Sequence, residues 1–101
     1  MSVLIIGKYK GDVATFRKAL ADRPDEFAAW KVKAQAAGSL HHRFAVGDGH
    51  VVVVDEWESP EDFEKFFDNP DLQAFVASCG ADTSAPPEIT ITEAIESPDQ
   101  F

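Results

Sequence analysis

The stretch that decides the fold runs from Leu40 to Trp57 and reads LHHRFAVGDGHVVVVDEW. Asp48-Gly49 near its centre is a strong signal for a two-residue hairpin turn, because both central positions of such a turn require a positive φ angle. Apolar and polar residues alternate before the turn, and a run of four valines follows it. The stretch therefore predicts two antiparallel strands joined by a tight turn.

A turn at Asp48-Gly49 also fixes which residues of the two strands lie opposite each other. On one face of the sheet, the opposed residues are Leu40 and Trp57, His42 and Asp55, Phe44 and Val53, and Val46 and Val51. His41 and Glu56 are then opposed on the other face. A β-bulge would shift these pairs, so the register depends on an unbroken ladder.

The segments on either side of the hairpin supply the remaining elements. Residues 3–10 are largely apolar and predict a first strand, after which Asp12 caps a helix. Pro24 divides the helical stripe that follows into two helices, and Gly38 ends the second one. After the hairpin, Ser59-Pro60 and Asn69-Pro70 each begin a helix. The last strand is marked by three isoleucines, namely Ile89, Ile91 and Ile95.

The resulting order is strand, helix, strand, strand, helix, strand, with each helical segment divided in two. This βαββαβ order predicts an α+β, ferredoxin-like domain over residues 1–101, with a four-stranded antiparallel sheet and helices on one face. Residues 3–6 and 51–54 are apolar at both strand parities, as in strands that are covered on both sides. The chain has no further layer to cover the second face. We therefore expect a homodimer that packs sheet against sheet.

Composition excludes several classes of function. The chain of 101 residues has 9 Lys and Arg against 18 Asp and Glu, a net charge of −9, which disfavours nucleic-acid binding. No apolar run is long enough to span a membrane, and no basic segment precedes the short apolar run at the N-terminus. The single Cys79 excludes an intramolecular disulfide. These features suggest a cytoplasmic protein without a membrane partner.

His42 and Asp55 are the candidate catalytic residues, because the predicted register places them side by side. A carboxylate beside an imidazole orients the ring as a general base. The alternative is an ordinary cross-strand pair. The three histidines cannot converge on one ion, so no metal site is expected. Five aromatic residues are candidate substrate-binding residues or else simply core: Trp57, Trp30, Phe44, Phe66 and Phe67.

One part of the sequence resembles a known family. Val54-Asp55-Glu56-Trp57-Glu58-Ser59, followed by Glu61-Asp62-Phe63 and by Asn69-Pro70-Asp71-Leu72, is similar to the antibiotic biosynthesis monooxygenase-like proteins. That resemblance implies a dimeric α/β barrel. The superfamily contains cofactor-free oxygenases, haem-degrading enzymes, cyclases and members of unknown role, so the motif indicates a fold more than an activity.

Departures from the haem-degrading relatives narrow the expected activity. Those relatives carry a His ligand after the second helix and an Asn on the first strand, whereas residues 72–80 contain no His and residues 3–10 contain no Asn. The resemblance then implies a cofactor-independent monooxygenase or cyclase, with no cofactor, acting on a small aromatic or polyketide-type metabolite. The alternative is a non-catalytic ligand-binding or stress-related barrel. A cavity beneath Trp57 that exposes His42 would favour the oxygenase.

Overall fold

The computed structural model describes residues 2–101 and contains four strands and four helices among them. In chain order they are β1 (Val3–Lys10), α1 (Val13–Asp22), α2 (Pro24–Ala37), β2 (Ser39–Gly47), β3 (His50–Trp57), α3 (Pro60–Phe67), α4 (Pro70–Ser78) and β4 (Glu88–Glu93). The expected βαββαβ order, with each helical segment divided in two, is confirmed.

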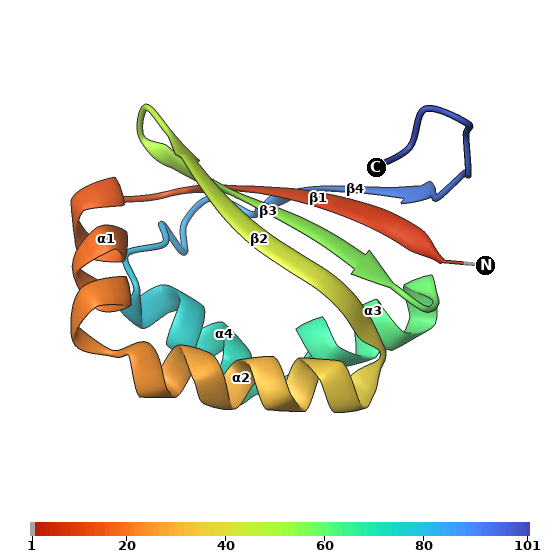
Figure 1. Cartoon of the computed structure of the whole chain (residues 1–101). Coiled ribbons are helices and arrows are strands. Elements are labelled where there is room, and N and C mark those ends of the chain that lie inside the picture. The colour runs from red at the N-terminus through yellow and green to blue at the C-terminus, as the bar shows by residue number, and fades with distance from the viewer. Residues whose placement is uncertain (1) are drawn as a thin grey trace.

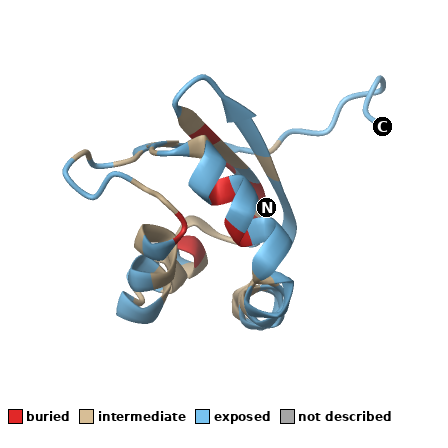
Figure 2. Ribbon diagram, turned by 90° about the vertical axis from the view of Figure 1, so that its left-hand side faces the viewer, coloured by how far each residue is buried: buried red, intermediate tan, exposed pale blue. Residues whose placement is uncertain are grey.

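The four strands form one antiparallel sheet in the order β2-β3-β1-β4. All four helices lie on the same side of this sheet, and no helix or strand of the described residues covers the other side (Figure 1). A view turned by 90° shows the C-terminal segment reaching away from the rest of the fold (Figure 2). The fold is therefore the ferredoxin-like α+β fold that the sequence predicts.

The helix ends are set by the residues that the sequence indicates. Asp12, Ser59 and Asn69 each accept hydrogen bonds from backbone N–H groups in the first turn of the helix that follows. Pro24 begins α2, because a proline in the first turn loses no helical hydrogen bond. Gly38 ends α2 with a φ angle of 118°, a left-handed conformation that favours glycine.

The hairpin register agrees with the expected one over most of its length. His42 pairs with Asp55, and Phe44 pairs with Val53, on the face toward the helices. The expected pairing of Leu40 with Trp57 is wrong. The register shifts between Ser39 and His41, so that Ser39 pairs with Trp57 and Leu40 is the extra residue of a bulge.

The last strand is shorter than its isoleucines predict. β4 ends at Glu93, where its pairing with the start of β1 also ends. Ile95 therefore lies outside the sheet, and its side chain is exposed.

Two separate clusters of buried side chains form the core. One joins Val3, Ile5, Trp57 and Phe63 at one end of the sheet, and the other joins Phe16, Ala19, Val51 and Cys79 at the opposite end. Trp57 and Ile5 are the most deeply buried large side chains, each 1% exposed. Full burial of one such side chain contributes roughly 1.5–3 kcal/mol. Partly buried aromatic rings lie between and around the two clusters.

The side of the sheet away from the helices has an apolar centre flanked by polar residues, and no helix or strand within residues 2–101 covers it. The alternating burial along β1 leaves Leu4 and Ile6 40% and 47% exposed, and Val54 on β3 is 44% exposed. We call Leu4, Ile6, Val52 and Val54 the outer-face patch. Across residues 2–101, none of the helices has the length and apolarity needed to cross a membrane.

Candidate functional site

A cavity of about 640 Å³ lies between the helices and the inner face of the sheet. Its walls are mostly aromatic and aliphatic, and they come from all four helices and from strands β1, β2 and β3. The exposed residues on its rim include Lys31 and Gln35 of α2 and Leu40 and His42 of β2. The cavity therefore opens to solvent between α2 and the edge strand β2.

His42 and Asp55 meet at the wall of this cavity. The Nδ1 atom of His42 lies 2.6 Å from Oδ1 of Asp55, and both residues line the cavity. The Asp55 side chain is 9% exposed, whereas the His42 side chain is 47% exposed. The carboxylate is thus held inside the fold, while the imidazole ring extends toward the opening.

Trp57 supplies the second hydrogen bond to this carboxylate. Its indole Nε1–H donates to Oδ2 of Asp55 at 3.1 Å. Residues two apart on a strand face the same side, so the spacing of Asp55 and Trp57 was the available sequence signal for this contact, and the sequence analysis missed it. Both carboxylate oxygens are therefore engaged, which satisfies a buried charged group and fixes its orientation.

The contact with Asp55 determines which ring nitrogen of His42 carries the proton. An ionised carboxylate only accepts hydrogen bonds, so the short contact places a proton on Nδ1 of His42. In the neutral ring, Nε2 then carries a lone pair. A ring in this state can take a proton from a ligand in the cavity, and the adjacent carboxylate stabilises the imidazolium that forms.

All five aromatic residues expected to bind substrate line the cavity, namely Trp57, Trp30, Phe44, Phe66 and Phe67. Three of the rings contact one another: Trp57 and Phe66 have centroids 5.3 Å apart, and Trp30 meets Phe66 edge-on at 6.0 Å. Phe44 lies edge-on against the His42 ring at 4.5 Å. Part of the aromatic wall is therefore one packed group around Phe66, and Phe44 lies against the imidazole.

Tyr9 is a polar lining residue that the sequence analysis did not identify. It lies on the inner face of β1 and is the only tyrosine of the chain. Burial raises the pKa of its hydroxyl well above the usual range, and the nearby charge of Asp55 raises it further. Tyr9 stands between Lys8 and Lys10 near the end of the strand, and this pattern gives no sequence signal that its side chain lines a cavity.

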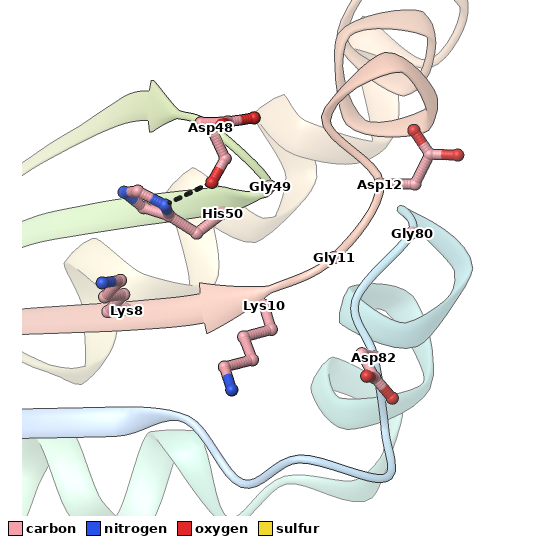
Figure 3. Close-up of a pocket in the computed structure, with 9 residues that line it drawn as sticks. All are labelled: Lys8, Lys10, Gly11, Asp12, Asp48, Gly49, His50, Gly80 and Asp82. Atoms are coloured by element: carbon pink, nitrogen blue, oxygen red, sulfur yellow. Dashed lines mark hydrogen bonds between the residues drawn. The ribbon is translucent and has the colours of Figure 1, made fainter.

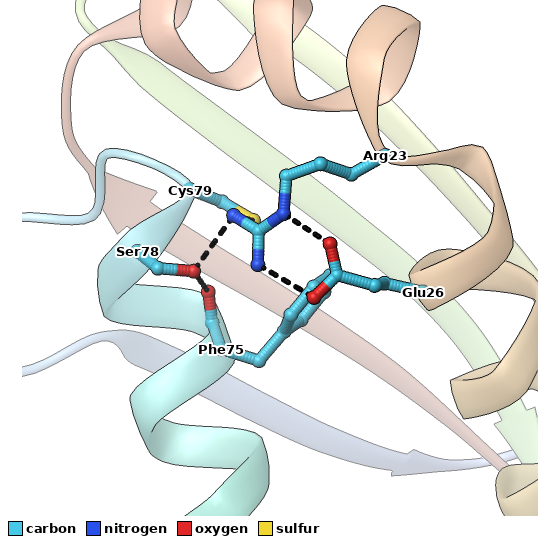
Figure 4. Close-up of polar contacts among 5 residues, drawn as sticks. All are labelled: Arg23, Glu26, Phe75, Ser78 and Cys79. Atoms are coloured by element: carbon cyan, nitrogen blue, oxygen red, sulfur yellow. Dashed lines mark hydrogen bonds and ion pairs between the residues drawn. The ribbon is translucent and has the colours of Figure 1, made fainter.

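The junction between α1 and α2 is tied to the end of α4 by Arg23 (Figure 4). Its guanidinium pairs with both carboxylate oxygens of Glu26, donates to Oγ of Ser78 at 2.9 Å, and lies 4.9 Å from the ring centroid of Phe75. Burial raises the pKa of the neighbouring Cys79 thiol. A buried, protonated thiol is a poor nucleophile.

A second hollow, of about 610 Å³, lies on the surface where β1 ends (Figure 3). Its lining mixes amines and carboxylates, among them Lys8, Lys10, Asp48 and Asp82. His50 belongs to this hollow and contacts the backbone carbonyl of Asp48 at 3.0 Å. No three His, Cys, Asp or Glu side chains within the described part of the chain are grouped as metal ligands. Because it lacks the apolar walls of the first, this hollow is a weaker candidate for an organic ligand.

The comparisons with known proteins identify a structural class. No protein-family model matches the sequence, and no curated protein matches it significantly. Among solved structures, the neighbours that share this ferredoxin-like fold include antibiotic biosynthesis monooxygenase-like proteins, together with proteins of unknown function. The resemblance seen in the sequence is thus confirmed for the fold.

Three of these neighbours match nearly the whole chain. SnoaB, a cofactor-independent oxygenase from Streptomyces nogalater, is 13% identical with a TM-score of 0.61, over 98% of both chains. A protein of Caulobacter crescentus described as a candidate antibiotic biosynthesis monooxygenase is 20% identical with a TM-score of 0.65, over 94% of this chain and 91% of that one. A Streptomyces coelicolor monooxygenase in complex with nanaomycin D is 16% identical with a TM-score of 0.64, over 95% and 89%.

Proposed function

We propose that this chain is a cofactor-independent monooxygenase that acts on a small aromatic or polyketide-type metabolite. The observation that carries the proposal is the aromatic-walled cavity with the His42–Asp55 pair at its opening. Its volume is that of a typical small-molecule site, and its walls are apolar with few polar groups, as such sites usually are. Similarity to SnoaB and to the monooxygenase with bound nanaomycin D supports the same class of reaction.

The proposed chemistry begins with a proton transfer from the ligand. His42 accepts, at Nε2, the proton of an acidic phenol or of the enolic form of an aromatic ketone. Asp55 holds the imidazole in the required tautomer and stabilises its charged form. The electron-rich anion then reacts with molecular oxygen. Conversion of a ring CH₂ to C=O consumes one O₂ and releases one water, so the substrate carbon supplies all four electrons.

The proposal includes a homodimer formed through the outer-face patch. Leu4, Ile6 and Val54 are all at least 40% exposed, and they lie side by side on neighbouring strands. A second copy of the same sheet would cover them in a symmetric, self-complementary contact. His41 and Glu56, whose side chains lie 3.9 Å apart on this face, would sit at the rim. The proposal also places the protein in the cytoplasm, a reducing compartment in which a free, buried thiol such as that of Cys79 is usual.

Oxygen uptake tests the catalytic proposal directly. With 1,8-dihydroxyanthrone as the substrate, we expect uptake by the wild type that His42→Gln lowers by about 100- to 10,000-fold, the usual contribution of a general base. Gln preserves a donor to Asp55 and cannot take a proton. His50→Gln, the same change at the opposite end of the hairpin, is the matched control and should retain full activity.

The same assay separates the proposal from its alternative. Wild-type protein that binds the anthrone without consuming oxygen would be a non-catalytic ligand-binding barrel. If the His42→Gln variant consumes oxygen as fast as the wild type, His42 is not the base. Another group would then have to accept the proton of the ligand.

A further inference from the structure

Tyr9 lies where it can contact a ligand at the inner end of the cavity. Its ring packs edge-on against Phe67 of α3, with centroids 6.3 Å apart and an interplanar angle of 73°. Both residues line the cavity. Tyr9 comes from β1, a central strand of the sheet, whereas His42 comes from the edge strand β2. The two polar side chains therefore approach the cavity from different strands.

Gly7 makes room for this position of the tyrosine ring. A Cβ atom on Gly7 would lie 3.3 Å from Cε1 of Tyr9 and 3.1 Å from Cδ1 of Ile89. Both distances are shorter than comfortable carbon–carbon contacts. Gly7 is buried and its φ angle is not positive, so its lack of a side chain serves the packing rather than the backbone. The Tyr9 ring therefore leans back along β1 over Gly7.

The Tyr9 hydroxyl is a hydrogen-bond donor without a protein partner. It makes no hydrogen bond to any of residues 2–101, and burial together with the charge of Asp55 raises its pKa. The hydroxyl therefore stays protonated at every physiological pH and cannot act as a base there. Among the described residues, no buried side-chain oxygen lacks a hydrogen-bond partner, so the unpartnered Tyr9 hydroxyl is accessible from the cavity that it lines. A neutral phenol in that position can donate to an oxygen atom of a ligand.

We propose that Tyr9, held in place by Gly7, is a ligand-binding residue that donates a hydrogen bond to a carbonyl oxygen of the aromatic substrate. The inference rests on the proposed function and narrows its substrate class to hydroxylated aromatic ketones. The acidic hydroxyl of the ligand lies toward His42, and the carbonyl lies toward Tyr9. A carbonyl suits this position better than a carboxylate, because the charge of Asp55 repels an anion.

A matched pair of ligands tests this contact without any need for turnover. 5-Hydroxy-1-tetralone and 5,6,7,8-tetrahydro-1-naphthol share a phenol and a fused ring, and only the first has a carbonyl. Quenching of tryptophan fluorescence gives both dissociation constants. The wild type should prefer the ketone by about three- to tenfold, the range for one neutral hydrogen bond. Tyr9→Phe, which keeps the ring against Phe67, should bind the two ligands within about twofold.

Gly7→Ala provides a second variant in which the hydroxyl is retained but displaced. It should also lose the preference for the ketone, while circular dichroism reports an intact fold for both variants. A ketone preference that is unchanged in Tyr9→Phe would overturn the role of Tyr9, and so would equal binding, or no binding, of the two ligands by the wild type. A preference unchanged in Gly7→Ala would overturn the role of Gly7. His42-dependent oxygen uptake would survive each of these results, so the inference and the proposed function fail separately.

Discussion

The indole Nε1–H of Trp57 donates a hydrogen bond to Oδ2 of Asp55, 3.1 Å away and two residues earlier on the same strand. The other oxygen of that carboxylate lies 2.6 Å from Nδ1 of His42 on the neighbouring strand. The carboxylate is thus held from two sides by donors whose rings are themselves packed in the cavity wall. Because the carboxylate is fixed in this way, His42 has a defined tautomer and is a candidate base rather than only one member of a cross-strand pair.

Asp55→Asn should lower the rate of oxygen uptake by about 100- to 10,000-fold, close to the effect of removing the base itself. The Trp57 N–H needs an acceptor, so the Asn carbonyl oxygen turns toward it and the amide N–H₂ turns toward His42. Nδ1 must then accept, which moves the ring proton to Nε2 and removes the lone pair that would take the ligand proton. Steady-state oxygen uptake measures the effect, and an unchanged kcat would contradict the orienting role of Asp55.

Trp57→Phe should lower the free energy of unfolding by at least about 1–3 kcal/mol, the cost of leaving one buried carboxylate oxygen without its donor. The loss of ring volume at a side chain that is only 1% exposed adds to this. Trp30→Phe is the matched control, because Trp30 is half-buried and its ring contacts Lys33 rather than a carboxylate. Urea denaturation compares the two variants. Equal losses would show that the hydrogen bond to Asp55 adds nothing to stability.

Tyr9 should titrate at a higher pH in the folded protein than in the unfolded chain. The unfolded tyrosine has a pKa of about 10. Burial, followed by the charge of Asp55, raises the folded pKa above that value. Above about pH 10 the unfolded state loses the proton first, so unfolding is favoured as the pH rises. The stability linked to neutral Tyr9 is fully present below that pH and declines above it.

The chain has one tyrosine, so the phenolate absorbance reports this group alone. We expect the absorbance to appear later in the pH titration of the native protein than in urea. In Tyr9→Phe, the alkaline decline in the free energy of unfolding should be shallower. Coincident titrations of native and unfolded protein would contradict the burial of the hydroxyl.

Leu4→Asp should weaken the proposed dimer by at least about 100-fold, because it buries a carboxylate beside its cross-strand neighbour Glu56 in each half of a symmetric contact. Val32→Asp also introduces a carboxylate, at an exposed position of α2, and should leave the dimer intact. Because each chain carries a net charge of −9, added salt should strengthen the wild-type association by screening repulsion. Sedimentation equilibrium measures all three effects, and a wild-type monomer at micromolar concentration would contradict the dimer.

Most of the fold could be predicted from local signals in the sequence. Asp48-Gly49 forms the expected two-residue turn, although only Gly49 and not Asp48 has a positive φ angle, and the resulting register brings His42 to Asp55. The caps at Asp12, Ser59 and Asn69 mark helix starts that the structure confirms. These signals act over a few residues, so tertiary context does not override them. The bulge at Leu40 and the end of the last strand before Ile95 depend on pairing partners, which no local pattern records.

The candidate site was predictable only in part, for a related reason. The register places Asp55 beside His42, but the hydrogen bond from Trp57 depends on how a large ring turns inside the core. The position of Tyr9 depends on the absence of a side chain at Gly7. From the sequence alone, a glycine inside a strand indicates only that the strand is weakened there. Both contacts are set by packing between elements rather than by the residues of one element.

The most direct measurement of the central claim is the ionisation state of a phenol bound in the cavity. 4-Nitrophenol absorbs visible light as the phenolate, so its spectrum reports proton transfer without any reaction with oxygen. At a pH below its solution pKa, binding to the wild type should produce the phenolate spectrum, because Nε2 of His42 takes the proton. His42→Gln should bind the same compound, as shown by tryptophan fluorescence, and leave it neutral. Identical spectra for the two bound complexes would contradict the account.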